Sequence, residues 1–474
     1  MIQALNETII YRKGKGDAAV TGVRKRVPKS RAMHAAMVIA VGFALIILAG
    51  ALLLMLPCAA KSGRATPFID ALFTATSATC VTGLVTVSTA VHWSLFGKCV
   101  ILLLIQIGGL GFMSVMTAAS LLLRRTITLR ERMVIGAGFG LDSSGGIVRL
   151  MRRVLVGTFL FEGVGAGLLS IRFVQQFGPL RGVGMGVFHA ISAFCNGGFD
   201  LMGTPDDPFC SLVHYAGDPL VNLTIMALIV LGGLGFFVWS DVWDHRRFRR
   251  LSLHSKLVLA MSGVLLGGGF VLTLLFEWSN PATLGGMSVP HRLLAAAFQT
   301  VTLRTAGFNT IDQSALTDPS QAVACVLMLI GGSPGSTAGG LKTVTVAVLA
   351  LSAVSALRGR TSVTAFGRTI EPRSIMNAVA LTVVGVTIIL GGACAISFIE
   401  NVPMNLCLYE TASAFGTVGL TMSLTPALSA VSHIMLIVMM YFGRVGVLTF
   451  GVAVFLRRRE PPKLTFPSGN VMIG

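Results

Sequence analysis

The chain has 474 residues, of which 54% are hydrophobic and only 12% are charged, and its formal net charge is +18. Apolar runs of about 20 residues recur, each long enough to cross ~30 Å of hydrocarbon, so the composition excludes a soluble globular protein. The positive charge does not indicate nucleic-acid binding, because most Lys and Arg side chains cluster between the apolar runs, as in cytoplasmic segments of membrane proteins. We therefore predict a multi-pass protein of the inner (cytoplasmic) membrane, in contact with lipid, with both termini cytoplasmic.

The eight cysteines form no CxxC pair, and most lie in apolar segments, so neither a zinc site nor a disulfide framework is indicated. The first apolar run, about 32–56, has full spanning length and is interpreted as a retained helix rather than a signal peptide. A basic cytoplasmic segment, 1–32, precedes it.

The rest of the chain follows one order of elements four times: a spanning helix, a short re-entrant helix, a loop with glycine, and a second spanning helix that returns to a basic cluster. The predicted repeats cover 33–124, 150–247, 256–357 and 375–456, and a cytoplasmic tail covers 457–474. The first spans are predicted at 33–56, 153–174, 256–278 and 375–399. The short helices are predicted at 68–78, 185–194, 289–301 and 403–414. The returning spans are predicted at 94–123, 219–243, 320–357 and 428–456. The short helices cannot cross a membrane, so eight spans result.

The loops carry the strongest signal. Their glycines, Gly83, Gly198, Gly307 and Gly419, lie about 110 residues apart in the runs SATCVTGL, SAFCNGGF, VTLRTAGF and SAFGTVGL. Such a period predicts an all-α integral membrane fold with four tandem repeats around a pseudo-four-fold axis. The alternative is that the glycines only make tight turns.

Non-helical backbone at membrane depth is tolerated where it lines a wet cavity, and glycine allows the backbone to point successive carbonyls inward. Rings of carbonyls can replace the hydration shell of a cation, and the negative ends of the preceding short helices favour the same charge. Only Arg304 places a cation in a loop, where it is expected to bond carbonyls. The predicted ion-binding filter consists of Val81, Thr82, Gly83, Asn196, Gly197, Gly198, Thr305, Ala306, Gly307, Thr417, Val418 and Gly419.

The third returning span contains a glycine-rich interruption, whereas the others continue through apolar sequence. Its low helix propensity predicts a break inside the membrane. A nucleotide-binding loop is excluded because Leu341 separates Gly340 from Lys342 and no strand precedes it. We interpret the segment as a gate below the filter, with a passive kink as the alternative. The predicted gate residues are Gly331, Gly332, Ser333, Pro334, Gly335, Ser336, Thr337, Ala338, Gly339, Gly340, Lys342 and Arg444.

Arg444 belongs to this set because a cation within a span is costly and therefore indicates function. Facing the pore, it would repel cations and bond carbonyls of the gate. The alternative is that Glu162 or Glu410 neutralises it for packing. Glu162 is itself interpreted as a paired buried acid, with a coupling site as the alternative.

The four loop sequences TCVTGL, CNGGFDL, LRTAGFNTID and FGTVGL resemble the filter loops of the Trk/Ktr/HKT superfamily of potassium transporters, and the resemblance covers the chain from about residue 33. It is closest to the Ktr membrane subunits, the KtrB group. The resemblance implies potassium uptake, a homodimer, a cytoplasmic ring of nucleotide-binding KtrA-like subunits that gates transport, and sodium dependence. It also supports the gate and the pore-lining Arg444. A Trk-type transporter linked to protons or sodium is the alternative.

Two other classes fit less well. Secondary carriers with inverted repeats differ because these four repeats begin and end on the same side. A membrane enzyme is not indicated, since the sequence has neither an HExxH motif nor a repeated cluster of His, Asp and Glu. We expect no tightly bound cofactor; potassium is the expected substrate and sodium a possible coupling ion.

Overall fold

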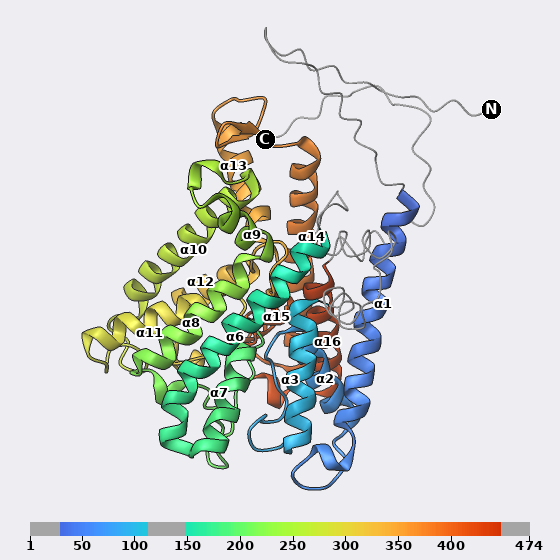
Figure 1. Cartoon of the computed structure of the whole chain (residues 1–474), viewed down its shortest axis with the longest axis vertical. Coiled ribbons are helices and arrows are strands. Elements are labelled where there is room, and N and C mark those ends of the chain that lie inside the picture. Colours follow the sequence, from blue (N-terminus) through green and yellow to red (C-terminus); the bar gives the residue numbers. More distant parts are fainter. Residues whose placement is uncertain (1–28, 112–146, 447–474) are drawn as a thin grey trace, which may run out of the picture.

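The computed structural model describes residues 29–111 and 147–446, and nearly all of their regular secondary structure is helical (Figure 1). In this described part, four helices are long and apolar enough to cross a membrane, or five if one bent pair counts as a single span. The long helices are α1 (Lys29–Leu54), α6 (Ile147–Phe177), α10 (Leu253–Glu277) and α14 (Pro372–Glu400). A multi-pass membrane fold follows, and the number of eight spans stays a prediction.

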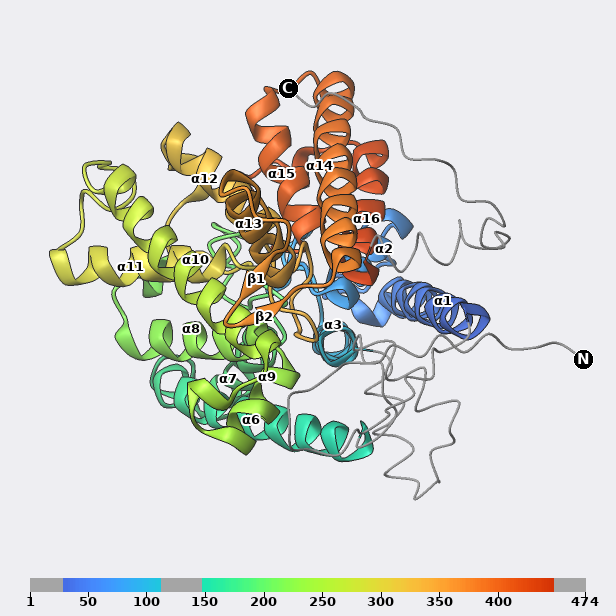
Figure 2. The same cartoon turned by 90° about the horizontal axis from the view of Figure 1, so that it is seen from above.

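A short helix and then a returning helix follow each long helix. The short helices are α2 (Phe68–Cys80), α7 (Pro179–Phe194), α11 (Val289–Thr302) and α15 (Met404–Gly416). The returning helices are α3 (Leu95–Leu110), α8 (Pro219–Leu234), α12 (Asp318–Leu329) and α16 (Ala430–Val445). Each short helix packs against the long helix before it. Figure 2 shows the four groups in chain order around the middle of the molecule, from blue through green and yellow to red.

Burial is reversed relative to a soluble protein, because the long helices expose apolar side chains and the short helices are enclosed. Leu45, Val264 and Met376 on long helices are 61%, 65% and 71% exposed. By contrast, every side chain from Phe73 to Cys80 at the end of α2 is buried. The outer apolar surface suits lipid, and the short helices end in the protein interior.

Carboxylates tie the long and returning helices together at one end of the molecule. Glu277 ends α10 and accepts a hydrogen bond from the N–H of Thr317, the residue that caps α12, at 2.9 Å. Glu400 ends α14 and accepts one from the N–H of Ser429, the cap of α16, at 3.0 Å. Asp218 caps α8 and pairs with Arg172 of α6 at 2.8 Å. A negative charge at a helix N-terminus is stabilising, so each contact fixes where the returning helix starts.

The other end of the molecule carries exposed arginines. Helix α9 (Phe236–His245) leads there to the short turn η3 (Phe248–Arg250), and α13 (Thr343–Leu357) leads to the hairpin β1 (Thr364–Ala365) and β2 (Arg368–Thr369). The rings of Phe248 in η3 and Phe366 in the hairpin turn lie 6.0 Å apart, edge to face, and join these two segments. The exposed arginines here are Arg246, Arg247, Arg249, Arg250, Arg358, Arg360, Arg368 and Arg373.

The returning helix of the second group breaks in the middle. Helix α8 ends at Leu234, Gly235 has a φ of +93°, and α9 starts at Phe236 with a bend of 91°. The prediction of one continuous span over 219–243 is therefore wrong, because the left-handed backbone at Gly235 ends the helix. The predicted interruption in the third group is present, since α12 ends at Leu329 and α13 begins at Thr343. The predicted N-terminal segment, the tail 457–474 and the ends of the first and last returning spans lie wholly or largely outside the described residues.

Candidate functional site

The four glycine loops share an unusual backbone conformation. In each loop the residue two positions before the glycine is left-handed, the glycine itself has positive φ, and the residue between them does not. The left-handed residues are Val81 (φ 57°), Asn196 (60°), Thr305 (66°) and Thr417 (52°); the glycines are Gly83 (98°), Gly198 (69°), Gly307 (85°) and Gly419 (93°). A left-handed β-branched residue such as Val81 is strained. The same left-handed conformation at four equivalent positions, three of them β-branched, makes these loops the candidate functional segments.

The four loops meet in a closed ring. A Cβ atom placed on Gly83 would lie 2.9 Å from the carbonyl oxygen of Gly197 in the second loop, and one on Gly198 would lie 2.9 Å from that of Ala306 in the third. Likewise, a Cβ on Gly307 would lie 2.6 Å from the Val418 oxygen in the fourth loop. A Cβ on Gly419 would lie 2.1 Å from the Thr82 oxygen in the first loop. Each loop therefore touches the next in cyclic order, and no side chain can replace these glycines without moving backbone.

Side chains contribute little to this ring. The Asn196 amide donates a hydrogen bond to the Thr305 hydroxyl at 3.3 Å and joins the second and third loops. The hydroxyls of Thr82 and Thr417 are buried and have no hydrogen-bond partner within 29–111 and 147–446. Each short helix ends immediately before its loop, so its partially negative end faces the ring. The arrangement offers carbonyl oxygens to a cation.

Arg304 does not bond the carbonyls of its loop as expected. Its side chain is 8% exposed, and its Nε has no hydrogen-bond partner in the described part of the chain. The buried Nε of Arg304 is therefore not satisfied by the carbonyls of its own loop.

The interrupted segment of the third group, residues 331–342, packs directly beneath the fourth loop. A Cβ on Gly339 would lie 2.1 Å from the hydroxyl oxygen of Thr417. Lys342 links two parts of the segment, because its Nζ donates hydrogen bonds to the carbonyls of Ala338 at 2.7 Å and Gly339 at 3.3 Å. Its ends are joined by a bridge between Ile330 and Leu341.

The same segment is docked on the broken helix of the second group. The N–H of Ser333 donates to the carbonyl of Gly233 at 3.0 Å, and the N–H of Thr337 donates to that of Gly232 at 3.3 Å. These carbonyls belong to the last turn of α8, which has no further helical partners because the helix breaks at Gly235. The interruption and the break therefore satisfy each other's backbone groups.

Arg444 joins three parts of the structure. Its guanidinium donates hydrogen bonds to the carbonyls of Thr337 in the interrupted segment and of Gly108 and Gly109 at the end of α3. Among the described residues, no carboxylate pairs with it. Neutralisation by Glu162 or Glu410 is therefore wrong, and the carbonyl contacts satisfy the buried charge instead.

The sequence profile of the TrkH family, described as cation transport proteins, matches residues 2–460. This chain belongs to the TrkH cation transport family. The resemblance inferred from the loops is confirmed, and the family consists of transporters rather than enzymes.

Similar proteins match over nearly the whole chain. The potassium/sodium uptake protein NtpJ of Enterococcus hirae is 38% identical over 460 residues, which cover 96% of this chain and 100% of that protein. The Ktr system potassium uptake protein B of Bacillus subtilis is 41% identical over 437 residues, covering 92% and 96%. The crystal structure of the potassium transporter TrkH from Vibrio parahaemolyticus matches with a TM-score of 0.70 and 16% identity, covering 89% of this chain and 85% of that one. The last match supports the fold.

Two buried carboxylates of this TrkH-family chain lie behind the loops. Glu162 accepts hydrogen bonds from the Gln106 amide at 3.1 and 3.2 Å and lies 3.8 Å from the Cys195 sulfur, so its partners are neutral rather than cationic. Glu410 accepts a hydrogen bond from the Thr425 hydroxyl, and its second oxygen has no partner in the part of the chain that the structure describes. Among the described residues, Glu162 is therefore a buried acid paired with neutral side chains.

The sequence analysis missed a second repeated motif that ends the returning helices. Gly-Gly-Leu-Gly-Phe occurs at 108–112 and again at 232–236. Its third glycine has positive φ in both copies, 79° at Gly111 and 93° at Gly235, and Gly446 after Arg444 has a φ of 89°. The identical pentapeptides were a signal available in the sequence. Arg444 contacts the first copy, and the interrupted segment contacts the second copy.

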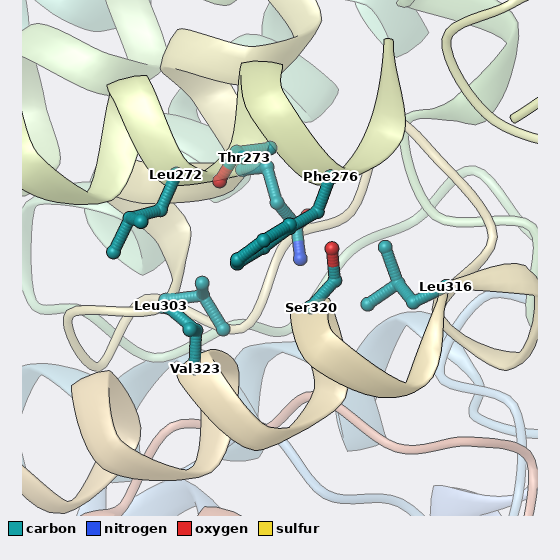
Figure 3. Close-up of a pocket in the computed structure, with 8 residues that line it drawn as sticks. Leu272, Thr273, Phe276, Leu303, Leu316, Ser320 and Val323 are labelled. Carbon is teal, nitrogen blue, oxygen red and sulfur yellow. The ribbon is translucent and has the colours of Figure 1, made fainter. Parts of the chain in front are cut away.

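A small pocket lies apart from the ring, between α10, α11 and α12 (Figure 3). Its lining consists of Leu272, Thr273, Phe276, Gln299, Leu303, Leu316, Ser320 and Val323. Because most of these side chains are apolar, we assign no ion to it. In the described residues no group of three or more His, Cys, Asp or Glu side chains could hold a metal ion. The loop carbonyls remain the candidate ligands for a cation in this family member.

Proposed function

We propose that this chain is the potassium uptake pathway of a Ktr-type system and that the four glycine loops form the selectivity filter of a pseudo-four-fold, eight-span pore. The cyclic contact of the loops carries the proposal. Each carbonyl preceding a filter glycine lies within 3 Å of the Cβ position of the glycine in the neighbouring loop. Carbonyl oxygens so arranged suit a dehydrated monovalent cation. The names of the relatives NtpJ and Ktr protein B support potassium as that cation.

Residues 331–340, with Lys342 and Arg444, act as the gate in this proposal. The segment packs against Thr417 of the filter and is hydrogen-bonded to Arg444, so its displacement would change access to the filter from below. Arg444 adds a positive charge beneath the filter that opposes cation passage. A passive kink is less well supported, because a kink alone does not require contacts with three separate elements.

Orientation and partners follow from charge and from the relatives. We place the arginine-bearing end and both termini in the cytoplasm, as the positive-inside rule favours, and propose the inner membrane as the location. The match to a Ktr system protein supports a cytoplasmic nucleotide-binding KtrA-like partner, and we propose a homodimer from the family resemblance alone. That partner would gate transport in response to its nucleotide, and sodium would stimulate uptake.

Rubidium-86 uptake tests the proposal in a bacterium that lacks its own potassium transport. We expect uptake above an empty-vector control and competition by unlabelled potassium. Uptake of sodium-22 without rubidium, in cells whose membranes contain the protein, would contradict potassium selectivity. Purified chain in liposomes, with and without a KtrA-like subunit and with ATP or ADP, then tests gating. Flux linked to external protons, rather than changed by sodium and nucleotide, would favour the Trk-type alternative.

A further inference from the structure

One hydroxyl-bearing residue near the end of each short helix holds the filter loop from behind. The residues are Ser77, Ser192, Thr302 and Ser413, and all four are fully buried. The carbonyl of each accepts a hydrogen bond from the N–H of the residue before the filter glycine. The pairs are Thr82 to Ser77 at 2.8 Å, Gly197 to Ser192 at 2.6 Å, Ala306 to Thr302 at 3.0 Å and Val418 to Ser413 at 2.8 Å.

The hydroxyl of the same residue makes a second contact, and this contact differs between repeats. Ser77 accepts the N–H of Gly83 at 3.0 Å, and Ser413 accepts that of Gly419 at 3.1 Å. Ser192 and Thr302 instead donate to the carbonyl of the residue after the glycine, Phe199 at 2.8 Å and Phe308 at 2.5 Å. The sequence follows the same division, because Leu follows the glycine in the first kind and Phe in the second.

The first kind of contact determines where a filter carbonyl points. In a trans peptide the C=O and N–H point in opposite directions. When the N–H of Gly83 is directed at Ser77, the carbonyl of Thr82 must therefore face the other way, toward the neighbouring loop at Gly419. The same holds for Val418 through Ser413. In the other two loops, the hydroxyl instead holds the carbonyl of Phe199 or Phe308 away from the ring.

We infer that Ser77, Ser192, Thr302 and Ser413 are positioning residues for ion selectivity. The hydroxyls of Ser77 and Ser413 accept hydrogen bonds from the first and fourth loops, and those of Ser192 and Thr302 donate to the second and third. The two halves are continuous: the first and fourth loops touch through Gly419 and Thr82, and the second and third are joined by Asn196 and Thr305. The inference rests on the proposed filter and adds the residues that orient its carbonyls.

The chain offers a matched control for three of these residues. Thr76, Thr300 and Thr411 are buried on the same short helices, but their hydroxyls donate to the carbonyl four residues earlier in the helix and not to the loop. Thr302 also allows an almost isosteric change, since Thr302→Val removes the hydroxyl and keeps the shape, whereas Thr302→Ser keeps the hydroxyl.

The test measures rubidium-86 uptake and its inhibition by sodium in liposomes, expressed as a ratio of the two cation affinities. This ratio is independent of how much folded protein each preparation contains. We expect Ser77→Ala, Ser413→Ala and Thr302→Val to change the ratio by about tenfold, since each frees a buried backbone group. Thr302→Ser and the controls Thr76→Val, Thr411→Val and Thr300→Val should leave it near the wild-type value.

An unchanged ratio in the three hydroxyl variants, or an equal change in their controls, would overturn the inference. A wild-type protein that prefers sodium would contradict the proposed potassium selectivity alone, because the variants would still be expected to change its ratio. Wild-type protein that carries neither cation would overturn both.

Discussion

The backbone N–H of Phe236 donates a hydrogen bond to the carbonyl of Gly335 at 2.9 Å. Phe236 is the first residue of α9 after the break in the second group, and Gly335 lies at the tip of the interrupted segment in the third. The proposed gate is therefore seated on a bend in a neighbouring repeat. Because α9 continues to the arginine-bearing end, movement there would be transmitted to the gate through this contact.

Replacing Gly235 tests whether the bend holds the gate. Its φ is +93°, and an added Cβ would lie 2.8 Å from the carbonyl oxygen of Pro334. The strain of ~1–3 kcal/mol that such a residue carries is enough to displace the gate segment. We expect Gly235→Ala to raise rubidium efflux from liposomes by about threefold or more. Gly367→Ala is the control, since Gly367 has a φ of +76° with nothing within 4 Å. Equal efflux from both variants and the wild type would contradict the role of the bend.

Arg444 is expected to be needed for a closed gate. Its guanidinium bonds carbonyls on two elements at once, which the compact ammonium of lysine cannot reproduce. Arg444→Ala and Arg444→Lys should both raise the maximal uptake rate or change the KM for rubidium. Size-exclusion profiles and unfolding temperatures separate this effect from misfolding. Loss of folded protein without any change in the transport of the remainder would indicate a packing role.

The loops were predictable from sequence and their surroundings were not. Gly83 and its three counterparts follow a short helix, so local pattern and period were sufficient to place them. Thr302 was not recognisable, because the alignment of the third loop places Val301 opposite Ser77, whereas the hydrogen bonds place Thr302 there. A loop shorter by one residue hides this shift until the backbone contacts are known.

The partners of Arg444 and Glu162 were also beyond reach of the sequence. Both were identified as buried charges, but their hydrogen-bond partners lie more than 30 positions away in the chain. The choice between a carboxylate and a carbonyl partner depends on how the helices pack. The break at Gly235 was overlooked because the flanking residues are apolar, and hydropathy alone does not distinguish a bent span from a straight one.

External pH should alter uptake through Asp200, which lies two residues after Gly198 and therefore within about 7 Å of it along the backbone. Burial raises the pKa of the Asp200 carboxyl to about 6, although hydrogen bonds from Met202, Gly203 and Ser211 oppose the shift. The carboxylate is thus charged above about pH 6 and attracts cations to the outer side of the filter.

We expect the KM for rubidium to rise by about two- to tenfold as external pH falls through 6, the change that one charge at this distance would cause. Asp200→Asn should show the higher KM at every pH and no step. The same shift means that protonation at low pH favours the folded state at this residue. A step of equal size in Asp200→Asn would assign it to another group.

Glu277 should contribute strongly to stability. Its buried carboxylate accepts hydrogen bonds from the side chains of Asn280 and Thr283 and from both the N–H and the hydroxyl of Thr317. Glu277→Ala leaves several buried donors unpaired, at a cost of ~3 kcal/mol or more. We expect a lower unfolding temperature in detergent, while Asp206→Ala, at an exposed position, stays near wild type. Unchanged unfolding would show that water replaces the carboxylate.

The selectivity of single glycine variants tests the filter most directly. Gly83→Ala, Gly198→Ala, Gly307→Ala and Gly419→Ala each place a Cβ against backbone of a neighbouring loop at a positive φ, whereas Gly63→Ala has a similar φ of +68° and nothing within 4 Å. In liposomes we expect the wild type and Gly63→Ala to prefer potassium over sodium, and all four filter variants to lose that preference or all transport. Retained potassium preference and normal rates in the four variants would contradict the assignment of these loops as the filter.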